Sequence, residues 1–135
     1  MGTKIIALLT FSLFLMSSNL NAQSIAYKLA VLEKGGYVSE NDASVKRFEN
    51  LLSQLDSKYQ LGKQKIADMT YKIKEVSNDR GLKVSLIKVM EGASQIDSKN
   101  YAEYLGMYLT LLEKGYKHDE ILDSIKLYYL LGLDQ

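Results

Sequence analysis

Apolar residues recur every three or four positions over most of the chain, the spacing that places side chains on one face of an α-helix. The clearest stretch begins at Ser39 and Asp42, which together resemble a capping box, and continues to Tyr59. Its apolar positions are Val45, Phe48, Leu51, Leu52, Leu55 and Tyr59. No stretch alternates apolar and polar residues for long enough to indicate a β-sheet. The pattern therefore predicts an all-α protein.

Glycines and short polar clusters divide this pattern into six predicted helices, and the chain contains no proline. Glycine commonly closes a helix because it adopts a positive φ angle without strain, and we expect such ends at Gly35, Gly81 and Gly115. Before the fifth helix, Asp97 or Ser98 is the expected N-cap. With their caps, the predicted helices span residues 24–34, 39–59, 63–78, 82–91, 97–114 and 119–131.

Residues 1–22 have the three-part order of a secretory signal peptide. A basic residue, Lys4, precedes an apolar run over residues 5–16 and a small polar stretch that ends at Ala22. The run has 12 residues, fewer than the ~20 that span a bilayer, so an uncleaved anchor is the weaker alternative. Leu20 is larger than the residue usually found near a cleavage site, but we predict cleavage after Ala22. The expected product is one exported helical domain, residues 23–135, without a stable membrane anchor, in the bacterial periplasm or outside the cell.

The charge balance argues against nucleic acid as a partner. The chain has 17 basic and 16 acidic residues, and removal of residues 1–22 takes away only Lys4, which leaves 16 of each. The lysines are interspersed with Asp and Glu, whereas nucleic-acid-binding proteins concentrate positive charge in a patch or stripe. A net charge near zero favours self-association. There is no cysteine, so the fold contains no disulfides.

Two segments of the chain are similar to each other at a constant offset. Residues 29–35 (LAVLEKG) resemble residues 109–115 (LTLLEKG), and the similarity continues through residues 44–48 and 124–128. An internal duplication of a helical hairpin is one interpretation. The other is that leucine-rich helices ending in Lys-Gly are a common local solution, and both stay open.

No catalytic or metal-binding pattern is recognisable. His118 is the single histidine, and a helix-start position beside Asp119 and Glu120 explains it without a catalytic role. The chain lacks the clustered ligands of a zinc site, the oxygen pattern of a calcium loop and a glycine-rich phosphate loop. We therefore expect no cofactor, no metal and no enzymatic activity.

Tyrosine is concentrated towards the C-terminal end of the sequence. Six of the ten tyrosines lie in residues 101–135, and the helix predicted there has an apolar and aromatic arc of about 160°, wider than the ~100° that a surface helix needs for its own core. Residues 127–133 are apolar almost all round a helix. Tyrosine is common at interfaces because its ring packs while its hydroxyl stays hydrated, although the same rings could line the edge of the protein's own core. The candidate partner-binding residues are Tyr101, Tyr104, Tyr108, Tyr128 and Tyr129.

These observations predict an exported, non-enzymatic helical binding module that holds a protein partner or a second copy of itself through its tyrosine-rich C-terminal helices. The alternative is a carrier of a small apolar ligand in a cavity between helices. An enzyme is the third hypothesis and has the least support.

Overall fold

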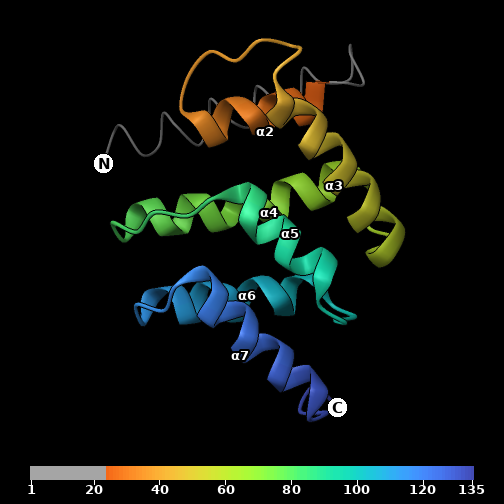
Figure 1. The fold of residues 1–135 in the computed structure, drawn as a ribbon, viewed down its shortest axis with the longest axis vertical. Helices are drawn as coiled ribbons and strands as arrows, with labels where there is room; N and C mark the ends of the chain where they lie inside the picture. The colour runs from red at the N-terminus through yellow and green to blue at the C-terminus, as the bar shows by residue number, and fades with distance from the viewer. Residues whose placement is uncertain (1–23) are drawn as a thin grey trace. The chain divides into compact units, whose positions relative to one another are not determined.

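The computed structural model describes residues 24–135, and the predicted signal peptide lies outside the described residues. The described chain forms six α-helices and no strand, which confirms the predicted all-α fold (Figure 1). The helices are α2 (Ser24–Lys34), α3 (Ala43–Tyr59), α4 (Lys63–Asp79), α5 (Leu86–Gln95), α6 (Tyr101–Glu113) and α7 (His118–Leu130). The chain divides into two compact units, one up to Asn50 and the other from Leu51 to Gln135, and α3 runs through the boundary. The predicted domain limits, 23–135, stay a prediction.

The first unit contains α2, the linker that follows it and the beginning of α3. Its buried apolar side chains are Ala26, Leu29, Ala30, Val38, Val45 and Phe48. Asp42 caps α3 by accepting a hydrogen bond from the backbone N–H of Ser44 at 2.9 Å, and its carboxylate also pairs with the ammonium group of Lys34 at 3.0 Å. The Ser44 hydroxyl also donates to this carboxylate, at 2.6 Å, and this bond, followed by those from the Ser44 N–H and Lys34, lowers the pKa of Asp42 to about 2. The Lys34 pair ties the end of one helix to the start of the next.

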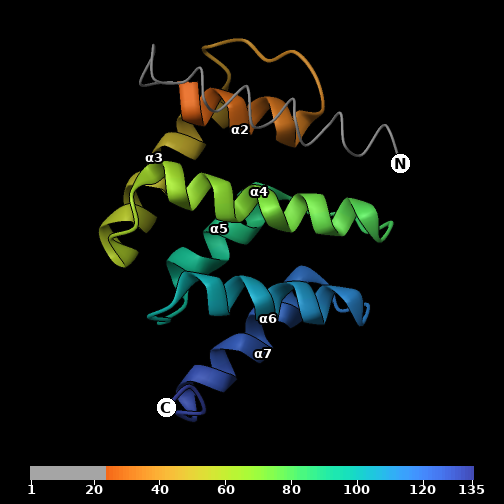
Figure 2. The same ribbon diagram turned by 180° about the vertical axis from the view of Figure 1, so that it is seen from behind.

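The second unit contains the rest of α3 and the four helices that follow. In both views α4 and α6 lie side by side and run in the same direction, α5 returns between them, and α7 packs against α6 (Figures 1 and 2). The ammonium group of Lys58 donates hydrogen bonds to the backbone carbonyls of Ala93, at 2.7 Å, and of Ile96. A cation beside these carbonyls interacts favourably with the partial negative charge at the C-terminal end of α5.

The predicted helix limits agree closely with the structure except at the starts of α3 and α6 and at both ends of α5. The second helix was expected to begin with a capping box at Ser39, but α3 begins at Ala43 with Asp42 as its cap, and the Ser39 hydroxyl accepts from the N–H of Asn41 instead. The fourth helix was expected over residues 82–91, but α5 occupies Leu86–Gln95. The backbone N–H of Leu82 donates to the Ser77 carbonyl at 2.8 Å and so completes the end of α4. The side chain of Ser85 then caps α5 by accepting from the N–H of Lys88. At α6 the N-cap is Asn100, which accepts from the N–H of Glu103 at 3.0 Å, so the expected caps Asp97 and Ser98 were wrong.

The two similar segments share a helix ending but not a complete hairpin. Gly35 and Gly115 both follow a helix with positive φ, 74° and 92°, as expected. The next helix begins at Ala43 in the first segment but already at His118 in the second, which corresponds to position 38 at the constant offset. The similarity therefore describes the glycine turn and the helices next to it, while the linkers differ in length.

Candidate functional site

Three of the five tyrosines predicted to bind a partner lie in the core of the second unit. The exposed fractions of Tyr101, Tyr104 and Tyr108 are 1%, 0% and 3%. Their rings follow one another along α6 with centroids 6.1 Å apart at each step. Tyr59 extends the row at one end, with its ring 5.1 Å from that of Tyr101. The face of α6 that carries these rings is therefore covered by the protein itself.

Each of these phenol groups has a hydrogen-bond partner inside the unit. The hydroxyl of Tyr101 lies 2.6 Å from the Thr70 hydroxyl, and that of Tyr104 donates to the Val89 carbonyl at 2.6 Å. The hydroxyl of Tyr108 lies 2.7 Å from Nδ1 of His118. Burial raises the pKa of all three phenols, that of Tyr108 to about 12.

The expectation that these three tyrosines face a partner is corrected by this burial. A buried hydroxyl must be hydrogen-bonded within the fold, and here all three are. The three hydroxyls and the rings of Tyr101 and Tyr104 are therefore not offered to another molecule. The wide apolar arc of α6 exists because α4, α5 and α7 all contact this helix.

The other two predicted tyrosines, Tyr128 and Tyr129, are half-buried near the end of α7. The Tyr129 hydroxyl donates to the Glu103 carboxylate at 2.7 Å, which ties α7 to α6. The Tyr128 ring packs edge-on against that of Tyr129, with centroids 5.1 Å apart. Both residues therefore lie at the boundary between core and solvent.

Four leucines beside these tyrosines are largely exposed. The exposed fractions of Leu127, Leu130, Leu131 and Leu133 are 54%, 81%, 61% and 59%. We call these four residues the C-terminal surface. Single exposed apolar residues are ordinary, but a group of large apolar side chains on one short segment is typical of a binding surface.

An apolar groove lies between α6 and α7. It has a volume of about 540 Å³ and is lined by Glu103, Gly106, Met107, Thr110, Leu111, Ser124, Ile125 and Tyr128. Gly106 leaves open space where other residues carry a side chain, since a Cβ added there would meet no atom within 4 Å. Tyr128 belongs to this groove and directly follows Leu127, the first leucine of the C-terminal surface, in α7.

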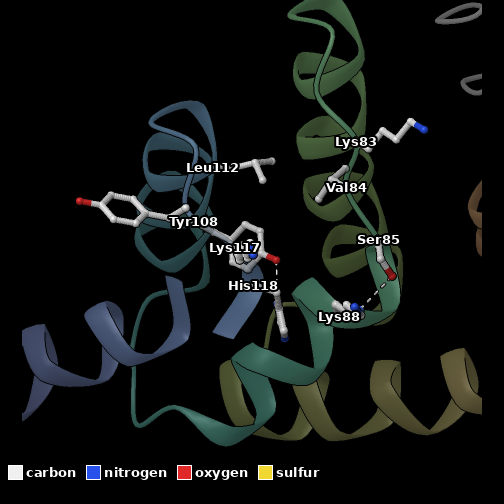
Figure 3. A pocket seen from close by; sticks show the side chains of 9 residues that line it. Lys83, Val84, Ser85, Lys88, Tyr108, Leu112, Lys117 and His118 are labelled. Carbon is white, nitrogen blue, oxygen red and sulfur yellow. Dashed lines mark hydrogen bonds between the residues drawn. The ribbon is translucent and has the colours of Figure 1, made fainter. Parts of the chain in front are cut away.

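A second cavity, of about 450 Å³, lies where the starts of α5 and α7 meet α6 (Figure 3). We call it the lysine pocket. Its lining residues are Lys83, Val84, Ser85, Lys88, Tyr108, Leu112, Tyr116, Lys117 and His118. No pattern in the sequence indicates this pocket, because the contributing segments, 83–88 and 108–118, are separate in the chain.

His118 is the first residue of α7, which agrees with the predicted helix-start position. Its ring is hydrogen-bonded to the Tyr108 hydroxyl. Burial lowers its pKa, and the nearby ammonium group of Lys88 acts in the same direction, whereas Asp119 and Glu91 oppose the shift. The Tyr108 hydroxyl lies 2.7 Å from Nδ1 of this imidazole, and this contact fixes the orientation of the His118 ring at the start of α7.

Residues 24–135 contain no group of three His, Cys, Asp or Glu side chains placed to hold a metal ion. Within the described helices, none has both the length and the apolar character needed to cross a membrane. No protein-family model, curated protein or solved structure matches the chain.

Proposed function

We propose that this protein is an exported, non-enzymatic binding module, and that a protein partner or a second copy of the chain docks on the C-terminal surface. The observation that carries the proposal is the exposure of Leu127, Leu130, Leu131 and Leu133, which lies between 54% and 81%. Export rests on the signal-peptide order of residues 1–22. The proposed binding region is thereby narrowed from the two C-terminal helices to the end of α7 and the residues after it.

Burial of the exposed leucines would contribute to the free energy of association but would not by itself offset the cost of association. Complete burial of one leucine contributes ~1.5–3 kcal/mol, so burying the exposed parts of all four contributes roughly 4–8 kcal/mol. Loss of translational and rotational freedom costs about 4–15 kcal/mol. A stable complex therefore needs additional contact area beside the leucines.

The groove between α6 and α7 provides this additional area. Its apolar lining includes Met107, Leu111, Ile125 and Tyr128, and Tyr128 lies next to Leu127 in α7. An apolar side chain of a partner that entered the groove would be buried on both sides by the two helices. Buried apolar anchors of this kind contribute most of the affinity at protein interfaces.

The test compares the native protein with a Leu130→Gln, Leu131→Gln variant. Both side chains are exposed, so the variant should fold as the native protein does. A matched control is Leu61→Gln, which replaces a leucine that is 40% exposed and outside the C-terminal surface. Molar mass in solution reports self-association, and cross-linked capture from the native envelope or medium reports a partner.

We expect the native protein and the Leu61→Gln control to form the same dimer or to capture the same single protein. The double variant should lose that complex and keep its helical circular dichroism spectrum. Equal complexes in all three proteins, or none in any of them, would rule out this surface.

A second candidate function is the carriage of a small apolar ligand, and the groove between α6 and α7 favours it. Its volume of about 540 Å³ lies in the range of small-molecule sites. A ligand that binds only the folded protein raises its unfolding temperature. Added lipid extract should therefore raise that temperature for a carrier and leave it unchanged for a module that binds only protein.

A further inference from the structure

Positive charge is concentrated at the lysine pocket although the described chain is electrically balanced. Residues 24–135 carry 16 basic and 16 acidic side chains, because Lys4 is the one charged residue before them. The pocket lining contains Lys83, Lys88 and Lys117 and no carboxylate. None of these three lysines takes part in the ion pairs Lys34–Asp42, Lys72–Glu75 and Arg80–Glu113.

The backbone adds to this positive potential. Ser85 caps the start of α5 and Lys117 precedes the first residue of α7, so the N-terminal ends of two helices border the same cavity. The helix dipole gives such ends a partial positive charge. The Glu120 carboxylate accepts from the backbone N–H of Lys117 at 2.9 Å. Asp119 and Glu91 are near enough to affect His118, but none of these three carboxylates lines the pocket.

The other walls of the pocket are apolar or aromatic. Val84 and Leu112 are partly exposed at opposite sides of the cavity, and the buried Tyr108 forms its base together with His118 (Figure 3). The Tyr108 hydroxyl is already engaged by His118, which leaves the ring as a packing surface. A cavity of about 450 Å³ with apolar walls and cations at the rim has the composition of a site for a small amphiphilic ligand.

We propose that the lysine pocket binds a small organic anion, with its charged group between Lys88 and Lys117 and its apolar body against Val84, Leu112 and Tyr108. Lys88 lies close enough to His118 to act on it electrostatically, and Lys117 directly precedes His118 in the chain. Lys83 is assigned a smaller part, because Figure 3 shows its side chain extending away from Tyr108 and His118. This site is separate from the C-terminal surface.

The test is calorimetric titration of the purified native protein with three probes that share one apolar chain. Octanoate and octyl phosphate present a carboxylate and a phosphate, while octanol is uncharged. The pocket variant is Lys88→Gln, Lys117→Gln. The control variant, Lys65→Gln, Lys99→Gln, removes the same charge from two exposed lysines that do not line the pocket.

We expect one molecule of octanoate or octyl phosphate to bind, more weakly at high salt, with octanol at least about tenfold weaker. The pocket variant should raise the Kd of the anions roughly tenfold or more, and the control variant should leave it unchanged. The Leu130→Gln, Leu131→Gln variant should bind the anions as the native protein does, which separates this site from the proposed docking surface. Failure of both anions to bind, equal binding of octanol, or an unchanged Kd in the pocket variant would overturn the proposal. The difference between the two anions identifies the preferred charged group.

Discussion

Two helical glycines of the second unit should respond in opposite directions to the same substitution by alanine. Gly92 lies in α5 and Gly106 lies in α6. In a helix interior, alanine is more favourable than glycine by ~0.8–1 kcal/mol because it loses less backbone entropy on folding. The space around each glycine decides whether this gain is kept.

At Gly106 nothing opposes the gain. A Cβ added there would have no atom within 4 Å, so the new methyl group would project into the groove without a clash. We expect Gly106→Ala to raise the free energy of unfolding by about 0.5–1 kcal/mol.

At Gly92 the new methyl group would collide with the core. It would meet the Tyr104 hydroxyl and would lie 2.5 Å from Cδ2 of Leu122. Leu122 can shift by rotation of its side chain, but the Tyr104 ring is fully buried and its hydroxyl is bonded to the Val89 carbonyl. Overpacking costs ~1–3 kcal/mol and loss of a buried hydrogen bond a further ~1–3 kcal/mol. After the helix gain is subtracted, Gly92→Ala should destabilise the protein by about 1–5 kcal/mol.

Urea unfolding followed by circular dichroism measures both changes, and a second background locates the clash. Tyr104→Phe removes the hydroxyl that the methyl group would meet, so Gly92→Ala should cost less in that background than in the native one. The reasoning is refuted if Gly92→Ala stabilises the protein as much as Gly106→Ala does, or if its cost is unchanged by Tyr104→Phe.

Three further predictions concern single side chains of the second unit. Burial lowers the pKa of His118 below its ordinary 6.5, so the unfolded chain binds the proton more readily and the free energy of unfolding should fall as the pH drops below about 6.5. In urea unfolding at a series of pH values, His118→Gln should reduce this fall. An unchanged pH dependence in the variant would contradict its assignment to His118. Lys58→Met keeps the apolar stem but removes the donor to the end of α5, so the free energy of unfolding should drop by about 1 kcal/mol, with Lys65→Met as an exposed control that changes little. Tyr101→Phe should cost about 0.5–1.5 kcal/mol in the same assay, because it removes the buried bond to Thr70 without opening a large cavity, and a neutral result would show that this bond adds nothing.

The helical fold and most of its boundaries could be predicted from the sequence because both are local properties. Apolar spacing identified each helix. Gly35 and Gly115 were expected to end helices because glycine adopts a positive φ angle without strain, and both have a positive φ angle in the structure. The start of α5 was placed four residues too early, since Leu82 has the apolar character of a helical residue but its N–H closes the end of α4. Whether Leu82 starts a new helix or closes the preceding one is decided by backbone hydrogen bonds, and the spacing of apolar residues carries no information about them.

What the sequence determined by itself was the six-helix, all-α character of the described chain and the unusual width of the aromatic face on α6. Whether that face met solvent, a partner or the protein's own core depended on how many neighbouring helices cover it. The tertiary structure places Tyr101, Tyr104 and Tyr108 inside and leaves Leu130 and Leu131 outside. It also brings Lys88 and Lys117 to one cavity from separate helices. Periodicity fixes the direction of a side chain relative to its own helix, but burial and proximity depend on the packing of helices that are distant in the chain.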